Sequence, residues 1–317
     1  MNQRTVLITG ANGQIGSVLT YALRDRLGPK NVLATDIHGE ESGDSLFERL
    51  DALDADRLHA LVEKYNVHTI YHLAAILSAR GEEKPRLAWQ VNMDSLFNVL
   101  EAARQYNLRV FFPSSIAVFG DSTPGIDTPQ DTIMQPTTVY GISKVAGEQW
   151  CQYYHQKYGV DVRSLRYPGI IGYQSLPGGG TTDYAVDIYH KAVLAEPFEC
   201  FLSSDARLPM MYMDDAIRAT VELMEAPAES IQVRTAYNVA AMSFTPAEIA
   251  EVIRRQVPDF SISYAPDFRQ KIAASWPESI DDSVARAQWG WEPAYDLERM
   301  TSEMLENLRS YYELENA

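Results

Sequence analysis

Residues 4–16 read RTVLITGANGQIG. The first six residues are rich in β-branched and apolar types, as in a buried strand, and apolar residues recur at helical spacing over 14–27. Three glycines lie where the two patterns meet: Gly10, Gly13 and Gly16. Glycines at this point let the backbone turn tightly and approach a pyrophosphate, which the free N–H groups at a helix N-terminus attract. The segment therefore predicts a dinucleotide-binding turn, with Gln14 and Ile15 opening its helix.

The first half of the chain alternates short β-rich runs with longer helical patterns. The further expected strands are 31–35, 69–73, 108–112 and 160–165, and the further expected helices are 53–65, 86–106 and 139–158. Alternation of this kind places helices on both faces of a parallel sheet, joined by right-handed crossovers. We therefore predict an α/β fold with a Rossmann-type, doubly wound parallel sheet.

The second half has a mixed pattern. Residues 169–183 are rich in glycine and proline, which predicts a loop. Helical patterns follow at 184–194, 214–224, 246–257 and 296–312, and extended runs at 198–202, 209–213 and 235–239. We expect residues 1–172 to form the dinucleotide-binding Rossmann domain, completed by parts of 209–240. Residues 173–317 are then mainly a smaller, mixed α/β lobe that binds the substrate.

Composition and charge argue against several classes of protein. The chain has 317 residues and a formal net charge of -16, which repels nucleic acid and anionic membranes. No segment reaches the roughly 20 apolar residues that span a bilayer, and no leader peptide is recognisable before the first strand. The two cysteines form no CxxC pair and the six histidines no HxxxH spacing, so we expect neither redox chemistry nor a metal. These features favour a cytoplasmic protein.

Asp36 ends the second expected strand, about 20 residues after the last glycine. A carboxylate at this position accepts hydrogen bonds from the adenosine ribose hydroxyls and repels a 2′-phosphate. Ile37 and His38 follow it, so no arginine compensates. We therefore expect NAD and not NADP as the cofactor. The spacing leaves two interpretations for Asp51, namely a contact with adenine or an ordinary helix cap.

Tyr140 and Lys144 lie four residues apart in a helical pattern and share one helix face. A tyrosine with a pKa near 10 is a weak base at neutral pH, and a neighbouring ammonium lowers that pKa. The pattern predicts Tyr140 as general base, with Lys144 lowering its pKa and holding the nicotinamide ribose. Ser114 and Ser115 end the preceding strand, at the edge where α/β sheets bind ligands. We expect one of them to orient the substrate oxygen and the other to serve in the turn.

Together these motifs resemble the extended short-chain dehydrogenase/reductase family. The matching segments, besides Asp36, are TGANGQIG (9–16), HLAA (72–75), VN (91–92), PSSIAVFG (113–120), YGISK (140–144) and RYPGIIG (166–172). They occur in the family's order over about the first 172 residues. The resemblance implies an NAD-dependent enzyme on a Rossmann fold.

The same resemblance implies roles for single residues. Ser115 matches the family's catalytic serine or threonine, and Ser114 is expected beside the nicotinamide. Asp51 and Ala52 match the adenine contact, and Asn92 is expected to brace the active-site backbone near the cofactor. Five more residues are expected to line the cofactor: Leu73, Ala74, Ala75, Tyr167 and Pro168.

The second half is similar to one branch of this family, the short-chain type of L-threonine 3-dehydrogenase. The similar segments are GGGTTDYAVDIYHKAV (178–193), LPMMYMDDAIRA (208–219) and IAASWPESIDDS (272–283). The similarity implies oxidation of the threonine 3-hydroxyl to L-2-amino-3-oxobutyrate with formation of NADH, as part of threonine catabolism.

The charged ends of L-threonine need partners in such a site. Besides Ser115 and Tyr140, the expected substrate residues are Ser78, Gly180, Thr181, Thr182 and Trp276. The glycines of this segment suggest a loop that closes over a small zwitterion, with backbone N–H groups as additional partners. Each residue also has a plain structural interpretation, as a loop hydrogen-bonding group or, for Trp276, as an anchor of the second lobe.

Two other functions share parts of this pattern. A nucleotide-sugar 4-epimerase or dehydratase with tightly bound NAD has a similar first half, but such enzymes usually carry asparagine where this chain has Gly169. A non-catalytic NAD sensor would keep the glycine turn and lose the Tyr140–Lys144 pair. The zinc-dependent, medium-chain threonine dehydrogenases are a poor match, because no metal-ligand spacing occurs.

The helical patterns 86–106 and 139–158 carry apolar and aromatic residues on more than one face, including Trp89, Phe97, Trp150 and Tyr154. One face must pack on the sheet, which leaves the other to meet a second subunit. In the family that the motifs resemble, these two helices commonly form a four-helix dimer interface. We therefore expect a homodimer with L-threonine as its small-molecule partner, and no nucleic acid or membrane partner.

Overall fold

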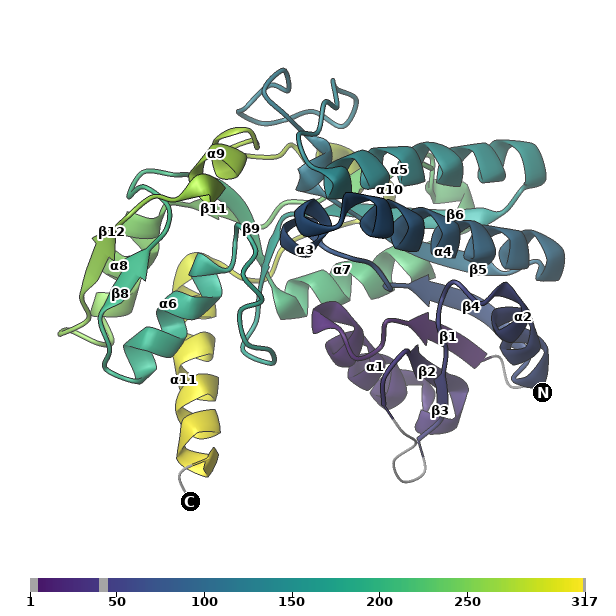
Figure 1. Ribbon diagram of the computed structural model, residues 1–317, viewed down its shortest axis with the longest axis horizontal. Coiled ribbons are helices and arrows are strands. Elements are labelled where there is room, and N and C mark those ends of the chain that lie inside the picture. Colours follow the sequence, from purple (N-terminus) through teal and green to yellow (C-terminus); the bar gives the residue numbers. More distant parts are fainter. Residues whose placement is uncertain (1–4, 40–44, 316–317) are drawn as a thin grey trace. The chain divides into compact units, whose positions relative to one another are not determined.

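The computed structural model describes residues 5–39 and 45–315, and it divides into two compact units (Figure 1). The first unit comprises Met1–Val118, Thr138–Arg166 and Ile217–Tyr237. The second comprises Phe119–Thr137, Tyr167–Ala216 and Asn238–Ala317. These units are defined by packing, so the assignment of NAD binding and substrate binding to two parts of the chain stays a prediction.

A seven-stranded sheet forms the centre of the first unit, in the order β10-β6-β5-β4-β1-β2-β3. The strands are β1 (Thr5–Thr9), β2 (Val32–Asp36), β3 (Phe47–Arg49), β4 (Val67–His72), β5 (Arg109–Ser115), β6 (Asp161–Tyr167) and β10 (Tyr237–Asn238). The pairs β1–β2, β2–β3, β1–β4 and β4–β5 are parallel. The predicted Rossmann-type, doubly wound sheet is confirmed, and it brings the carboxyl ends of β1, β2, β4 and β5 to one edge.

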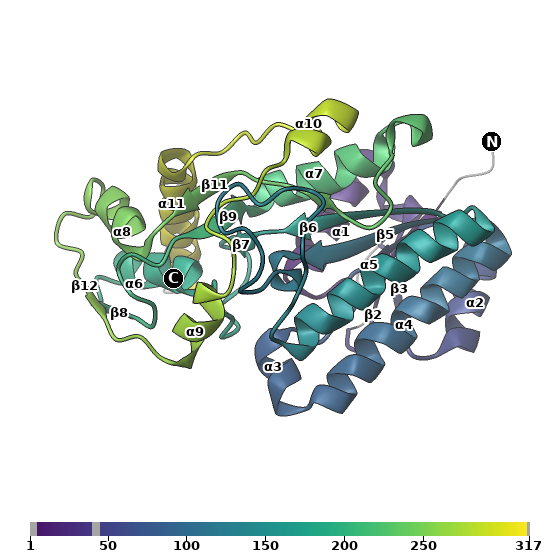
Figure 2. The same ribbon diagram turned by 90° about the horizontal axis from the view of Figure 1, so that it is seen from above.

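Helices cover both faces of this sheet. They are α1 (Gln14–Leu27), α2 (Ala55–Lys64), α3 (Ser78–Glu83), α4 (Pro85–Tyr106), α5 (Val139–Tyr158) and α7 (Met213–Glu225), with 3₁₀ turns at Pro29–Asn31, Ile116–Val118 and Ala228–Ser230. In Figure 2, α2, α4 and α5 lie on one face, with α4 and α5 side by side, and α1 lies on the other. Leu58, Leu96 and Val110 are fully buried where α2, α4 and β5 meet, and removing this apolar surface from water stabilises the sheet.

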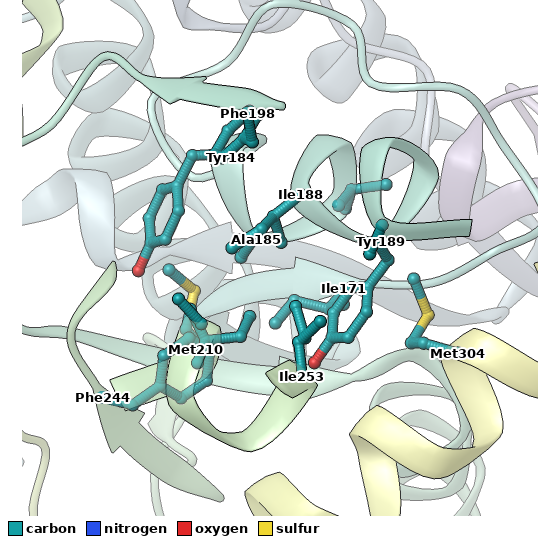
Figure 3. Close-up of a cluster of buried hydrophobic side chains, with 14 of the residues drawn as sticks. Ile171, Tyr184, Ala185, Ile188, Tyr189, Phe198, Met210, Phe244, Ile253 and Met304 are labelled. Carbon is teal, nitrogen blue, oxygen red and sulfur yellow. The ribbon is translucent and has the colours of Figure 1, made fainter. Parts of the chain in front are cut away.

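Over its described residues, the second unit contains two small sheets and five α-helices. Its strands β7 (Gly169–Ile171), β9 (Leu208–Tyr212) and β11 (Met242–Phe244) form one sheet, and β8 (Phe198–Cys200) and β12 (Ile262–Tyr264) form the other. The helices are α6 (Tyr184–Val193), α8 (Pro246–Arg254), α9 (Phe268–Ala274), α10 (Ser283–Trp289) and α11 (Leu297–Glu315). Figure 3 shows Tyr189 of α6 among side chains of β9, α8 and α11 in the core of this unit.

One expectation for the second half is wrong at its start. Residues 169–183 were expected to form a loop, but the first three form β7, which pairs in parallel with Met210, Met211 and Tyr212 of β9. The partner strand lies about forty residues along the chain, so this pairing has no local sequence signal. None of the described helices is both long and apolar enough to cross a membrane.

Candidate active site

The glycine turn has two positions at which there is no room for a side chain. Gly10 has a φ of +67°, and a Cβ there would lie 2.7 Å from the backbone nitrogen of Ala74. A Cβ on Gly16 would lie 2.1 Å from the carbonyl oxygen of Gly10. Gly13 is the N-cap of α1, whose first turn holds no acidic side chain. The backbone N–H groups in the first turn of α1, at the positive end of this helix, therefore remain suited to a pyrophosphate, so the residues fit a dinucleotide.

Asp36 lies at the end of β2, as predicted. Its Oδ2 accepts a hydrogen bond from the backbone nitrogen of Asn12 at 3.1 Å, and its Oδ1 accepts one from that of His38 at 3.2 Å. A carboxylate oxygen takes more than one donor, so Asp36 can still accept ribose hydroxyls. Asp51 accepts from the backbone nitrogen of Leu53 at 3.0 Å. This is a local turn contact, and the capping interpretation of Asp51 is wrong, because the N-cap of α2 is Asp54, whose Oδ1 accepts from the backbone nitrogen of Arg57 at 2.9 Å. The adenine contact of Asp51 stays a prediction.

The segment after β4 is tied to the end of β1. The backbone nitrogens of Leu73 and Ala74 donate to the carbonyl oxygen and the hydroxyl of Thr9, at 3.1 and 3.3 Å. His72 lies between the Thr9 hydroxyl, 2.9 Å from Nδ1, and the Ser95 hydroxyl, 3.1 Å from Nε2. Burial lowers the pKa of His72 to about 3, so the imidazole is neutral. His72 therefore packs between the end of β1 and helix α4, and it does not serve as an acid or a base.

Asn92 on α4 links this segment to α5. Its Oδ1 accepts from the backbone nitrogen of Ile76 at 2.7 Å, and its Nδ2 donates to the carbonyl oxygen of Ile76 at 3.0 Å. The same Nδ2 donates to the Ser143 hydroxyl at 3.1 Å, which in turn donates to the carbonyl oxygen of Tyr140 at 2.7 Å. Both ends of the amide are thus bonded to protein, which fits a brace and does not favour a direct contact with a ligand.

The three predicted catalytic side chains gather at the carboxyl end of β5. Tyr140 lies in the first turn of α5, whose N-cap is Thr138, and its side chain is hydrogen-bonded to that of Ser115. The Nζ of Lys144 donates to the carbonyl oxygen of Pro113 at 2.7 Å and lies 5.4 Å from the centroid of the Tyr140 ring. Lys144 is 4% exposed, so its ammonium is held in a dry, fixed position.

The expected direction of the Tyr140 pKa is wrong for this geometry. Burial raises the pKa of Tyr140 to about 12, and the hydrogen bond from Ser115 offsets it only in part. Burial also lowers the pKa of Lys144 to about 8. Spacing alone places an ammonium near a phenol but does not reveal that both lie in a low-dielectric environment, where charged forms are disfavoured. The rise in the Tyr140 pKa caused by desolvation therefore outweighs the lowering that was expected from Lys144.

Ser114 and Ser115 have different partners. Ser115 contacts Tyr140, whereas the Ser114 hydroxyl donates to Oε1 of Glu148 at 2.5 Å. Glu148 forms an ion pair with Arg166 at 2.8 Å, and their side chains are 0% and 3% exposed. Sequence reasoning missed this pair, although Glu148 lies one helical turn beyond Lys144 and Arg166 opens the RYPGIIG segment. The signal available in the sequence was the four-residue spacing of Glu148 from Lys144, which places both on one face of the helix.

The substrate residues predicted in the second unit cluster before α6. The backbone nitrogen of Gly180 donates to Oδ2 of Asp183 at 2.8 Å, so this N–H already has a protein partner. Thr181 is buried, and the Thr182 side chain lies where a Cβ on Gly169 would come within 2.7 Å of it. This close packing gives a structural reason for glycine at position 169.

The remaining predicted site residues lie in packed positions or at the start of a helix. Trp276 is half-buried against the core of the second unit, as the anchor interpretation expects. Tyr167 is buried and donates from its hydroxyl to the carbonyl oxygen of Ala216 at 3.5 Å, and Pro168 is buried beside it. Ser78 is the first residue of α3 in the first unit. Over 5–39 and 45–315, no three His, Cys, Asp or Glu side chains are grouped to hold a metal ion.

Comparisons with known proteins place the chain in a family. Residues 6–240 match the model of the NAD dependent epimerase/dehydratase family. An uncharacterized epimerase/dehydratase of Staphylococcus aureus strain USA300 is 51% identical over 308 residues, 96% of each chain.

Solved structures are similar over nearly the whole chain. A GalE-like L-threonine dehydrogenase from Cupriavidus necator, in its holo form, has a TM-score of 0.94 and 59% identity, covering 96% of this chain and 99% of that one. A monomeric L-threonine 3-dehydrogenase from a metagenome, in its apo form, has a TM-score of 0.94 and 48% identity, covering 97% and 99%. On the match to its model and on these relatives, the chain belongs to the NAD-dependent epimerase/dehydratase family.

Proposed function

We propose that this chain oxidises the 3-hydroxyl group of L-threonine to L-2-amino-3-oxobutyrate, with formation of NADH, as a step of threonine catabolism. The observation that carries the proposal is the grouping of Tyr140, Ser115 and Lys144 in a chain 59% identical to a threonine dehydrogenase. The cofactor is NAD, as the family's description states.

Most of the residues that would hold NAD belong to the first unit, and Tyr167 and Pro168 belong to the second. We assign the pyrophosphate to the glycine turn, Gly10, Gly13, Gln14, Ile15 and Gly16, and the adenosine ribose to Asp36. Asp51 and Ala52 would contact the adenine, and Leu73, Ala74, Ala75, Tyr167 and Pro168 would line the rest. When bound, NAD supplies the acceptor for the hydride that leaves the substrate carbon.

Proton removal falls to the side chains at the end of β5. A substrate hydroxyl placed against both Ser115 and Tyr140 would be oriented by the serine and would pass its proton to the phenolate oxygen of ionised Tyr140. General bases of this kind contribute about 10²- to 10⁴-fold to rate. Lys144, fixed by the carbonyl oxygen of Pro113, places a positive charge beside the phenolate that accepts the proton.

Recognition of the amino acid is assigned to Ser78, Gly180, Thr181, Thr182 and Trp276. L-threonine carries an ammonium and a carboxylate that lose water on binding, so each needs a polar partner. Hydroxyl groups donate to a carboxylate and accept from an ammonium, which suits Ser78 and the two threonines. The cytoplasmic location predicted from the sequence remains part of this proposal.

NADH absorbance tests the proposal directly. Purified protein with NAD and L-threonine is expected to form NADH, and UDP-glucose and UDP-galactose serve as parallel substrates. Interconversion of the two sugars without threonine-dependent NADH would assign the chain to the epimerases. In that case the cofactor residues would stand and the substrate residues would not.

We further propose that the enzyme is a homodimer through α4 and α5. These helices expose large apolar side chains to solvent, among them Trp89 (42% exposed) and Trp150 (38% exposed). Trp150 packs edge-on against Phe97, with ring centroids 4.8 Å apart, so the patch spans both helices. Exposed, contiguous apolar surface of this kind is typical of protein interfaces.

A further inference from the structure

A buried ion pair lies directly behind the proposed catalytic side chains. Glu148 is on the same face of α5 as Lys144, one helical turn further on. Its Oε1 accepts a hydrogen bond from the Nε of Arg166 at 3.0 Å, and its Oε2 accepts one from an Nη of the same residue at 2.8 Å. Oε1 also accepts the Ser114 hydroxyl at 2.5 Å. The carboxylate thus joins α5, β5 and β6 within the first unit.

We propose that Glu148 is a positioning residue for proton transfer at Tyr140, a proposal that rests on the proposed function. It holds the serine-bearing end of β5 against α5, and it places a fixed negative charge near Lys144.

The geometry of β5 explains the first effect. Ser114 and Ser115 are adjacent at the end of β5, so fixing Ser114 on Glu148 also fixes the backbone that carries Ser115. Ser115 is the residue whose side chain is bonded to Tyr140. A two-pronged contact between Arg166 and the carboxylate keeps Glu148 itself in one orientation. Loss of the Ser114 contact would therefore loosen the neighbouring Ser115–Tyr140 hydrogen bond.

The charge near Lys144 explains the second effect. Among the described residues, the titratable groups that face Lys144 are Tyr140, Glu148 and Cys151 from α5 and His72 from β4, with Arg166 of β6 reached through Glu148. Burial raises the pKa of the Cys151 thiol far above its usual range, so Cys151 is uncharged. His72 is neutral as well. Glu148 is therefore the group whose negative charge opposes the loss of the Lys144 proton on burial.

The test measures the titration of Lys144 without any substrate. In protein carrying ¹³C at the lysine Cε atoms, NMR follows each ammonium with pH, and Lys144→Arg identifies the Lys144 signal. The wild type is expected to titrate near pH 8 at this residue. Glu148→Gln is expected to lower that value by at least about half a pH unit, because the opposing charge is gone. Glu148→Asp keeps the negative charge, so Lys144 is expected to titrate close to its wild-type pH in this variant.

Activity supplies the second readout. Glu148→Gln is expected to lose at least about 10-fold in kcat while its NAD affinity, followed by tryptophan fluorescence, stays within about twofold. Glu101→Gln is the matched control, because Glu101 is paired with Arg104 on exposed surface of α4. A folded Glu148→Gln protein with an unchanged Lys144 titration would overturn the proposal, whatever its stability.

Two further arms keep the test decisive. If Glu148→Gln does not fold, Ser114→Ala removes the strand-end contact and leaves the ion pair, so kcat is expected to fall with the Lys144 titration unchanged. An unchanged kcat in Ser114→Ala would then overturn the proposal. Failure of the wild type to oxidise L-threonine would reject the proposed function separately, because the Lys144 titration requires no substrate.

Discussion

At the scale of single residues, the phenol of Tyr140 is the group on which the proposed chemistry depends. Tyr140→Phe removes one oxygen and leaves the ring in its buried position. We expect turnover of L-threonine to fall by at least about 10²-fold, since the general base is lost. NAD affinity, measured by fluorescence titration, is expected to stay within about threefold because the glycine turn and Asp36 are untouched. Tyr153→Phe on the exposed side of α5 is the matched control, and an active Tyr140→Phe protein would rule out the assigned base.

The pKa values of the buried pair predict how activity depends on pH. Oxidation needs Tyr140 in its ionised form, and burial raises the pKa of this phenol to about 12. The ionised fraction of Tyr140 therefore increases with pH throughout the neutral range, so kcat/KM for L-threonine is expected to rise from pH 7 to about pH 8. Above pH 8 the rise is expected to flatten, because Lys144, whose pKa burial lowers to about 8, loses the positive charge that it places beside the phenolate. Rates of NADH formation at fixed ionic strength provide the measurement. A maximum below pH 7 would show that another group accepts the proton.

Single residues differ in how far the sequence could predict them. The contact of Tyr140 with the end of β5 was predictable, because motif spacing places both at the edge of a parallel sheet. Burial was not, since it depends on every element around the site, and so the direction of the Tyr140 pKa was wrong. The Glu148–Arg166 pair was missed for the same reason. Glu148 lies at helical spacing from Lys144, but Arg166 lies on a different element, so no local pattern shows that these two side chains form a buried pair.

At the scale of elements, α5 must approach β5 closely for Lys144 to reach its position. Gly147 makes this possible, because a Cβ there would lie 2.5 Å from the Cζ atom of Phe112. The Phe112 ring also lies under the Lys144 ammonium, 4.5 Å from centroid to Nζ. Gly147→Ala is therefore expected to push the ring, displace Lys144 and destabilise the fold by about 1–3 kcal/mol.

Thermal unfolding and NADH formation check the Gly147 prediction together. Gly125→Ala is the control, since no described atom lies within 4 Å of a Cβ added there. We expect the melting temperature and kcat to fall for Gly147→Ala and to stay near wild type for Gly125→Ala. Equal melting temperatures for the two variants would mean that the helix and strand tolerate a wider spacing.

Elements were predictable where their signals are local. Both α1 and α5 begin and end at the expected residues, because glycines and an apolar 3.6-residue repeat mark α1, and Thr138 and Gly159 cap α5. The short strands β3, β7, β11 and β12 and the helices α3, α9 and α10 were not predicted. They are three to seven residues long, and their stability comes from pairing and packing with distant segments.

At the scale of the whole molecule, the acidic surface and the apolar face of α4 and α5 have opposite consequences for association. A net charge of -16 disfavours non-specific contact between copies. Against that repulsion, a dimer needs a concentrated apolar patch. The aromatic side chains of α5 form one, because Tyr153 packs edge-on against Trp150 with ring centroids 5.4 Å apart.

The proposed dimer predicts a selective effect of charge on this face. Trp150→Arg places a cation in the centre of the patch, where burial in an interface would leave it unpaired. We expect sedimentation velocity to show the wild type as a dimer and Trp150→Arg as a folded monomer. Tyr21→Arg, at a residue 76% exposed on α1, is expected to remain dimeric and is the control for an added charge. A monomeric wild type, as in the metagenome enzyme of similar structure, would reject the dimer, and a dimeric Trp150→Arg protein would move the interface to another surface.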